Sequence, residues 1–293
     1  MSGFALPGAV QADSGLSDTM QTIGRENYYV GANGASNNAV NVDKNMESAG
    51  VIGGYAGFGP GSSEANENHL TVTAGGDVNG HMYGGYARSD STSAVAGSNS
   101  VTVSDGQISY DVCGGNAWSI SGEAVADRNS VAVSGDTVSG NIFGGHGYSG
   151  AGRAEADHNS VAVSGGTVKG MICGGWIESE GDNAAADYNT VTMSGGAVQG
   201  SIYGGYVMNL DGSAETNSNR VTVSGGAVSV SKMGSVYGGW AYSGNQKAAA
   251  NQNNVLISGG TVTAAEVFGG MAMSRTADAE ANSNGVMVTE ILR

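Results

Sequence analysis

The sequence predicts an all-β protein built as a parallel β-helix (β-solenoid) of about eight coils, each of about 30 residues. Three observations lead to this prediction: a repeat of that length, apolar residues alternating with small ones inside each copy, and 52 glycines against only 2 prolines in 293 residues. So much glycine with so little proline excludes a collagen-like chain. A chain with 40% apolar and only 13% charged residues also differs from disordered segments.

Two markers recur in register along the chain: an asparagine shortly before a V-x-V triplet, and a Gly-Gly pair further on. Successive copies follow at steps of 30, 31 or 34 residues. The best-formed copy runs from Asn159 to Tyr188. In a β-helix the asparagines would stack at one corner as a ladder of side-chain amides. They are Asn38, Asn68, Asn99, Asn129, Asn159, Asn189, Asn219, Asn253 and Asn284.

Each copy has the period of two that is typical of strands. Val161 and Val163 alternate with small residues, 165–166 are a Gly-Gly turn, and Val168 begins a second alternating run. The polar, alanine-rich stretch 176–188 is either a loop or a third short strand. No window of helical length shows helical periodicity. The sequence therefore predicts strands and turns only.

Two architectures can use such a unit. In a parallel β-helix each copy is one coil and like residues stack, whereas in a repeated β-hairpin array the segment VSGGTV closes a two-residue hairpin. The β-helix is favoured, because a propeller blade needs about 40–50 residues. In the β-helix, the repeat position that follows the central turn forms a continuous column of apolar core residues. That column holds Val78, Ile108, Val138, Val168, Val198, Val228 and Val262.

The two cysteines separate the two architectures. Cys113 and Cys173 occupy the same repeat position two coils apart, which is about 9.6 Å at the usual strand spacing. A disulfide needs Cα atoms within about 7 Å. The β-helix therefore predicts two free thiols that act as small apolar residues. The hairpin array does not fix the distance between the two cysteines and predicts neither a disulfide nor free thiols.

The N-terminal residues suggest export. Residues 1–12 are apolar and rich in small residues, and Val10-Gln11-Ala12 before Asp13 fits the small-x-small rule for signal-peptide cleavage. No Lys or Arg precedes Arg25, so we interpret 1–12 as a truncated signal-peptide remnant; a chance match at the N-terminus is the alternative. Residues 13–37 would then form an N-terminal cap or partial coil, and 38–293 the repeat solenoid.

The segments NSVAVSGG, TVSGNIFGG and TVTMSGGAVQGSIYGGY resemble the tandem repeats of bacterial autotransporter passenger domains, the exported part of type V secretion proteins. The resemblance covers about residues 38–289. It implies a right-handed parallel β-helix on the outer surface of a Gram-negative cell, often with an adhesive role. That family ends in an outer-membrane translocator barrel, whereas this sequence stops within a repeat. We therefore expect the solenoid to continue beyond residue 293, and we assign no membrane insertion to this segment.

Charge and residue spacing exclude several classes of function. The net charge of -15 would repel nucleic acids. The four histidines (His69, His81, His146 and His158) fall in four different repeat positions, without metal-ligand spacing. The recurrent serines are better explained as turn-capping hydroxyls than as nucleophiles. We expect neither a metal nor a cofactor.

The acidic residues do not form a catalytic pair. Asp127, Asp157 and Asp187 recur two positions before the asparagine, where other copies carry an asparagine. A polysaccharide-cleaving enzyme would place its carboxylates at one irregular point of the rod. This column is periodic, so we interpret it as turn-forming, with raised pKa values or calcium relieving the repulsion between stacked carboxylates. We expect no enzymatic activity.

The candidate binding feature is an aromatic stripe after the Gly-Gly pairs. Facing outward, it would be a platform for sugar rings or a protein partner; facing inward, it would fill a corner of the core. Strict alternation would put it on the inner side with Met82, but the Gly-Gly pair can reset the alternation. The position holds Tyr55, Tyr86, Asn116, His146, Trp176, Tyr206, Trp240 and Met271; we take Tyr55, Tyr86, His146, Trp176, Tyr206 and Trp240 as binding candidates.

These observations predict an exported cell-surface solenoid that acts as an adhesin or adhesive stalk through many weak contacts along a rigid rod. The expected partner is a glycan or a protein on a host or neighbouring cell, and the rods could also associate with one another. A purely structural spacer of a larger autotransporter is the alternative. A polysaccharide-active enzyme is the least favoured.

Overall fold

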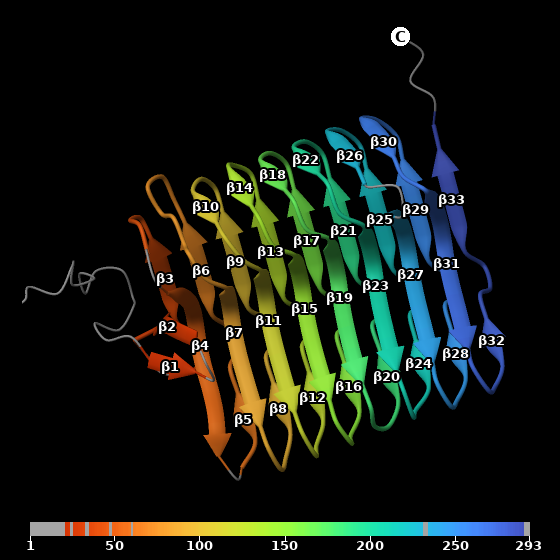
Figure 1. The fold of residues 1–293 in the computed structure, drawn as a ribbon, viewed down its shortest axis with the longest axis horizontal. Helices are drawn as coiled ribbons and strands as arrows, with labels where there is room; N and C mark the ends of the chain where they lie inside the picture. The colour runs from red at the N-terminus through yellow and green to blue at the C-terminus, as the bar shows by residue number, and fades with distance from the viewer. Residues whose placement is uncertain are drawn as a thin grey trace, which may run out of the picture.

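The computed structural model describes residues 21–23, 26–32, 35–46, 49–59, 61–230 and 234–289, so the signal-peptide remnant expected at 1–12 lies outside the described residues. All regular structure in the described part is β, with 33 strands and no helix. The coils follow one another in chain order along the long axis of the molecule (Figure 1). The predicted all-β solenoid is thus confirmed.

Two sheets of stacked strands run along the rod. The long sheet consists of β1 (Gln21–Ile23), β2 (Glu26–Val30), β4 (Gly50–Gly59), β7 (Met82–Ser89), β11 (Val112–Ser119), β15 (Ile142–Ser149), β19 (Ile172–Ser179), β23 (Ile202–Asn209), β27 (Ser235–Ser243) and β31 (Glu266–Ser274). The valine sheet consists of β3 (Ala39–Val42), β6 (His69–Val72), β9 (Ser100–Val103), β13 (Ser130–Val133), β17 (Ser160–Val163), β21 (Thr190–Met193), β25 (Arg220–Val223), β29 (Asn254–Ile257) and β33 (Gly285–Val288).

Two narrower sheets close the coil at its two ends. The turn sheet, which follows the first Gly-Gly turn, consists of β10 (Gln107–Ile108), β14 (Thr137–Val138), β18 (Thr167–Val168), β22 (Ala197–Val198), β26 (Ala227–Ser229) and β30 (Thr261–Thr263). The alanine sheet consists of β5 (Ser63–Glu64), β8 (Ala94–Val95), β12 (Ala124–Val125), β16 (Ala154–Glu155), β20 (Ala184–Ala185), β24 (Ala214–Glu215), β28 (Ala248–Ala249) and β32 (Ala279–Glu280).

Strand pairing excludes the hairpin array. β17 pairs in parallel with β13 and β21, and β18 with β14 and β22, so the two strands that flank a Gly-Gly turn do not pair with each other. Like repeat positions are in register: Val161 lies opposite Val131 and Val191. Among the described strands, antiparallel pairing occurs only between β1 and β2, within the stretch expected to form an N-terminal cap; β2 then pairs in parallel with β4.

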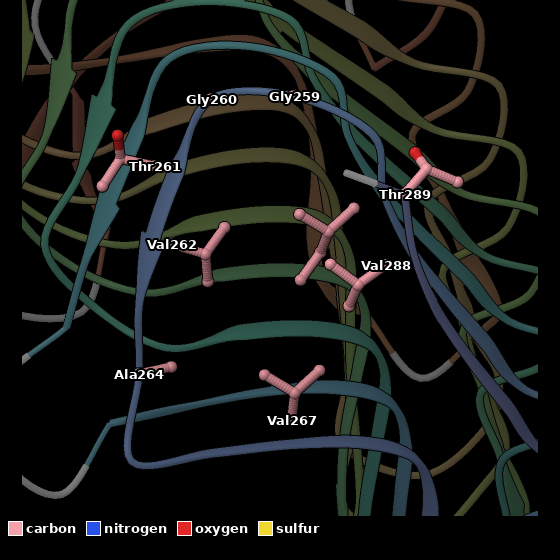
Figure 2. A pocket seen from close by; sticks show the side chains of 9 residues that line it. Gly259, Gly260, Thr261, Val262, Ala264, Val267, Val288 and Thr289 are labelled. Atoms are coloured by element: carbon pink, nitrogen blue, oxygen red, sulfur yellow. The ribbon is translucent and has the colours of Figure 1, made fainter. Parts of the chain in front are cut away.

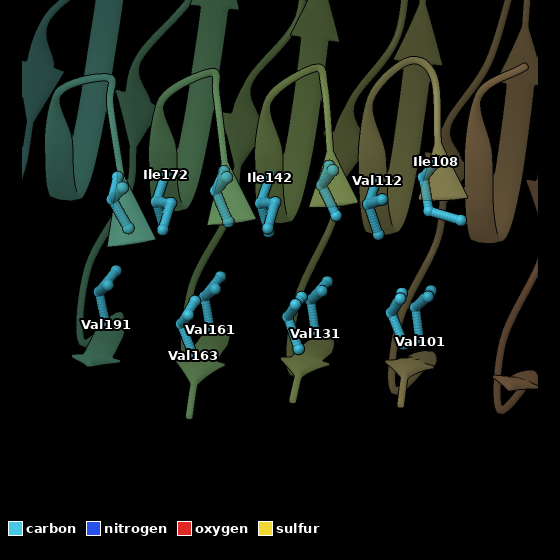
Figure 3. Packing of buried hydrophobic residues seen from close by; sticks show 14 of the residues in the cluster. Val101, Ile108, Val112, Val131, Ile142, Val161, Val163, Ile172 and Val191 are labelled. Carbon is cyan, nitrogen blue, oxygen red and sulfur yellow. The ribbon is translucent and has the colours of Figure 1, made fainter. Parts of the chain in front are cut away.

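The interior of each coil has two apolar compartments. The valine core lies between the valine sheet, the turn sheet and the first residues of the long strands, and its side chains stack in columns (Figure 3). The alanine core lies between the ends of the long strands and the alanine sheet. In β19, Ile172 packs in the valine core and Ile177 in the alanine core. Burying columns of branched side chains is the main stabilising term of such a rod.

A narrow waist separates the two cores. The asparagine at the corner before each valine strand folds back to the interior, where it meets the Gly-Gly pair of the preceding copy. A Cβ atom on Gly174 or Gly175, for example, would lie 2.7 Å from Asn189 Cβ or 2.6 Å from Asn189 Nδ2. Glycine is therefore required here by close packing of the interior.

At the C-terminal end of the described residues the valine core opens to the surface. A hollow of about 620 Å³ lies inside the last coil. Figure 2 shows Val262, Ala264, Val267 and Val288 around it. These residues continue the interior columns of the preceding coils, so the hollow is the exposed end of the valine core.

Candidate functional site

The aromatic stripe lies on the outer face of the long sheet. Both glycines of each Gly-Gly pair turn toward the interior asparagine, and the pairing of β15 with β19 skips Gly144 and Gly174. Two consecutive inward residues shift the alternation by one, as in a β-bulge. Trp176, which alternation alone would place inside with Ile172, therefore lies on the face opposite both cores and is partly buried.

The rings of the stripe form two stacks along the rod. Tyr206 lies between Trp176 and Trp240, with ring centroids 3.8 Å and 4.4 Å apart and nearly parallel planes. Tyr55 and Tyr86 form the other stack, with centroids 5.5 Å apart. The structure therefore brings five of the six candidate binding residues into ordered stacks. The sixth, His146, stacks on Phe143 at 5.2 Å.

A second outward column borders the stripe on its N-terminal side. It contains both cysteines, which are free and buried, as the β-helix predicts. Cys113, Phe143 and Cys173 pack beneath Trp176, Tyr203 and Tyr206 as an apolar cluster separate from both interior cores. Burial raises the pKa of both thiols well above their usual range, so neither is a reactive thiolate at neutral pH.

A third outward column, two residues after the stripe, was missed by the sequence analysis. Trp118 and Tyr148 stack there with centroids 4.1 Å apart, and Trp176 Nε1 donates a hydrogen bond to Glu178 in the same column (3.3 Å). The signal was present in the sequence, because strand alternation places these residues on the same face as the stripe. The aromatic surface is thus three columns wide.

The stripe is interrupted at β11, where its position holds Asn116 and the bordering column holds Cys113. A pocket of about 370 Å³ opens at this point on the outer face. Its lining includes Tyr86, Trp118, Phe143, His146 and Trp176, together with Asp111 and Glu178.

The structure places the predicted asparagine column in the interior waist, fully buried except at its last member. Asn129 Nδ2 donates to Asn159 Oδ1 (3.2 Å) and to the Ala96 carbonyl (2.8 Å), and Asn129 N donates to the same Oδ1 (2.8 Å). The backbone N–H to amide Oδ1 bond links successive members from Asn38 to Asn284. This column joins successive coils inside the rod.

The aspartate column forms a similar series at the outer corner. Asp127 Oδ1 accepts a hydrogen bond from Asp157 N (2.8 Å), and Asp157 Oδ1 accepts one from Asp187 N (2.7 Å). Burial, and then the neighbouring carboxylates of Asp187 and Asp127, raise the pKa of Asp157 to about 7. Because these carboxyl groups accept hydrogen bonds from the backbone of the next coil, the column has a structural role. This agrees with its recurrence from copy to copy.

Metal-ligating clusters and membrane-spanning helices are absent from the described part of the chain. No group of three or more His, Cys, Asp or Glu side chains there is arranged to hold a metal ion. His158 instead stacks on Tyr188 at 4.9 Å, and His81 lies between Glu26 and Asp111. None of the described residues forms a helix of the length and hydrophobicity needed to cross a bilayer.

The aromatic surface is therefore the feature of this solenoid best suited to contact another molecule. Comparison of the chain with protein-family models, with curated proteins and with solved structures finds no match to any of them.

Proposed function

We propose that this chain is a non-enzymatic, exported β-solenoid that acts on a bacterial cell surface as an adhesin or adhesive stalk. The observation that supports the proposal most is the outward stack of Trp176, Tyr206 and Trp240. Tyr and Trp combine an apolar body with a polar tip, which suits them to binding surfaces. The resemblance of the repeats to autotransporter passenger domains supports export and surface display.

The proposed mechanism is multivalent. One coil offers only a few side chains, but the stripe and its two bordering columns repeat at each coil on a rigid rod. Several weak contacts to a repetitive glycan or protein surface then add through effective concentration. The partner is a glycan or protein on a host or neighbouring cell, and the net charge of -15 disfavours anionic partners.

A binding screen tests the proposal. Residues 13–293 are applied to arrays of glycans and matrix proteins beside the double variant Trp176→Ala/Trp240→Ala, whose fold is checked by circular dichroism. We expect wild-type binding that is lost in this variant. A matched variant, Tyr110→Ala/Tyr188→Ala, removes two rings that are 52% and 55% exposed away from the stripe, and it should bind normally.

The alternatives give different results. A structural spacer would show no binding by any of the three proteins. A polysaccharide-active enzyme would release reducing ends from a glycan, which a binding protein does not. Loss of fold in the stripe variant would show that the rings stabilise the solenoid, and would contradict a role in binding.

A further inference from the structure

The interruption of the aromatic stripe at β11 creates a defined gap. Tyr86 and His146 occupy the stripe on either side of Asn116. They are separated by two strand spacings, about 9.6 Å. One flat ring placed midway would lie at ordinary stacking distance from Tyr86 and would meet the Nδ1 edge of His146, whose ring face packs on Phe143. The pocket of about 370 Å³ at this point is within the usual size range of small-molecule sites.

The gap also exposes ring faces that are covered elsewhere. In the stack around Tyr206, both faces of that ring are occupied by Trp176 and Trp240. Along the rod Tyr86 stacks on Tyr55 alone, with Tyr83 of its own coil tilted against it at 5.3 Å, and the coil on its other side carries no ring at the stripe position. A ligand that stacks on an aromatic face therefore has its best access at Asn116.

The floor of the gap carries polar groups with unused hydrogen-bonding capacity. Asn116 is only 6% exposed, its Nδ2 lies 3.3 Å from His146 Nδ1, and its Oδ1 is buried without a partner among the described residues. Burial lowers the pKa of His146 to about 4, so the ring is neutral at pH 7. Whichever way the amide is turned, the pair has at least one donor and one acceptor left over.

This combination discriminates between classes of ligand. Asp111 and Glu178 at the rim disfavour an anion. A cation would use the carboxylates and ring faces but has no use for the donor of the Asn116–His146 pair. An aromatic ring would fill the gap but leave the remaining donor and acceptor of the Asn116–His146 pair buried and unpaired, which is costly. A hydroxyl both donates and accepts, and a sugar ring has an apolar face bordered by hydroxyls.

We infer that the gap at Asn116 is a binding site for one neutral pyranose ring, held between Tyr86 and His146 with its hydroxyls on the Asn116–His146 pair. The inference rests on the proposed function, because it names the ligand class that one part of the same aromatic surface recognises. It assigns the site to one place on the rod, around Asn116, whereas the proposed adhesion uses contacts along its whole length.

Saturation-transfer NMR on the full chain tests the inference with three neutral probes: methyl α-D-mannopyranoside, methyl β-D-glucopyranoside and methyl β-D-galactopyranoside. We expect transfer to the ring C–H protons of at least one glycoside. Asn116→Leu keeps the side-chain size but removes the polar atoms, so affinity should fall at least tenfold. Circular dichroism should show an unchanged fold, because the substitution removes the unpaired Oδ1 together with the partner of His146 Nδ1.

Asn116→Tyr should also abolish glycoside binding, by restoring the residue type that Tyr86 and Tyr206 provide in other coils. The matched control is Met271→Tyr, which adds a ring at the other stripe position that lacks one, and it should bind the glycoside normally. Choline and p-cresol serve as the cationic and aromatic probes. Stronger binding of either at the gap, or unchanged glycoside binding in both Asn116 variants, overturns the inference.

Failure of the inference is distinguishable from failure of the proposed function. If the chain binds the glycan or matrix array and this binding needs Trp176 and Trp240, but no glycoside binds at the gap, the adhesin proposal stands and the pyranose site is wrong. If a glycoside binds at the gap but no surface is bound by the whole chain, the pyranose site stands and the adhesin proposal is wrong.

Discussion

At the scale of single residues, the glycines of the waist decide whether a coil can close. A Cβ atom on Gly175 would lie 2.6 Å from Asn189 Nδ2 and closer still to the carbonyl oxygen of Ala156. Because a backbone atom cannot move aside cheaply, we expect Gly175→Ala to lower the free energy of unfolding by about 3 kcal/mol. Urea denaturation followed by circular dichroism measures this change.

Gly147, on the adjacent coil, provides the matched control. A Cβ atom there would meet chiefly the tip of the flexible Ile177 side chain, and the paired position in β11 is Ala117. Gly147→Ala should therefore be neutral or stabilising, because alanine reduces the freedom of the unfolded chain. Equal changes in the free energy of unfolding for Gly175→Ala and Gly147→Ala would contradict close packing at the waist.

At the scale of elements, the aspartate corner couples stability to pH. The folded pKa of Asp157, about 7, lies above the unfolded value of about 3.9. The protonated carboxyl is thus favoured in the folded state, so its stabilising contribution is complete below pH 4 and is lost as pH rises through 7. We expect Asp157→Asn to raise stability by about 1–2 kcal/mol at pH 8, after allowance for solvent screening, and little at pH 4.

Thermal unfolding at the two pH values measures this difference. Asparagine fits the corner, because Asn217, two coils further on, accepts the corresponding backbone hydrogen bond from Asn251 N (3.1 Å). The control is Asp43→Asn, at an exposed position outside the column, and it should show no such pH dependence. A larger gain at pH 4 than at pH 8 would contradict the raised pKa.

The elements themselves could be predicted from sequence, but the faces of the long strands could not. Valine alternation and the repeat length specify parallel coils, and the positions of Cys113 and Cys173 follow from the same register. The face of Trp176 depends on how two glycines pack against Asn189 from the end of the coil, a tertiary contact that alternation does not contain. Sequence analysis accordingly left both orientations of the stripe open.

At the scale of the whole molecule, stability should be close to a sum of coils and their interfaces. Deleting residues 159–188 removes one complete copy and brings β13 beside β21 with every column in register. We expect a folded, shorter solenoid that unfolds cooperatively. Deleting only residues 159–178 joins unlike repeat positions, and it should abolish the cooperative transition. Thermal unfolding followed by circular dichroism compares the two deletion variants. Similar transitions would contradict a rod whose stability depends on keeping like repeat positions in register.

The proposed binding surface was only partly predictable. The stripe was identified from its period, but the pocket arises where the period fails. Asn116 interrupts the stripe in the sequence, and only the structure shows that its amide is buried beside His146 with an atom left unpaired. The column of Trp118 and Tyr148 could have been found by extending the alternation beyond the stripe.

If the outward rings bind a surface by many additive contacts, as we propose, the effect of losing each ring is seen best in the rate of dissociation. On the glycan or matrix protein bound most tightly in the screen, we compare wild type with Trp176→Ala, Trp240→Ala and the double variant. Each single substitution should speed dissociation several-fold, and the double variant should multiply the two effects. Wild-type dissociation in the double variant, or effects matched by Tyr110→Ala/Tyr188→Ala, would contradict the account.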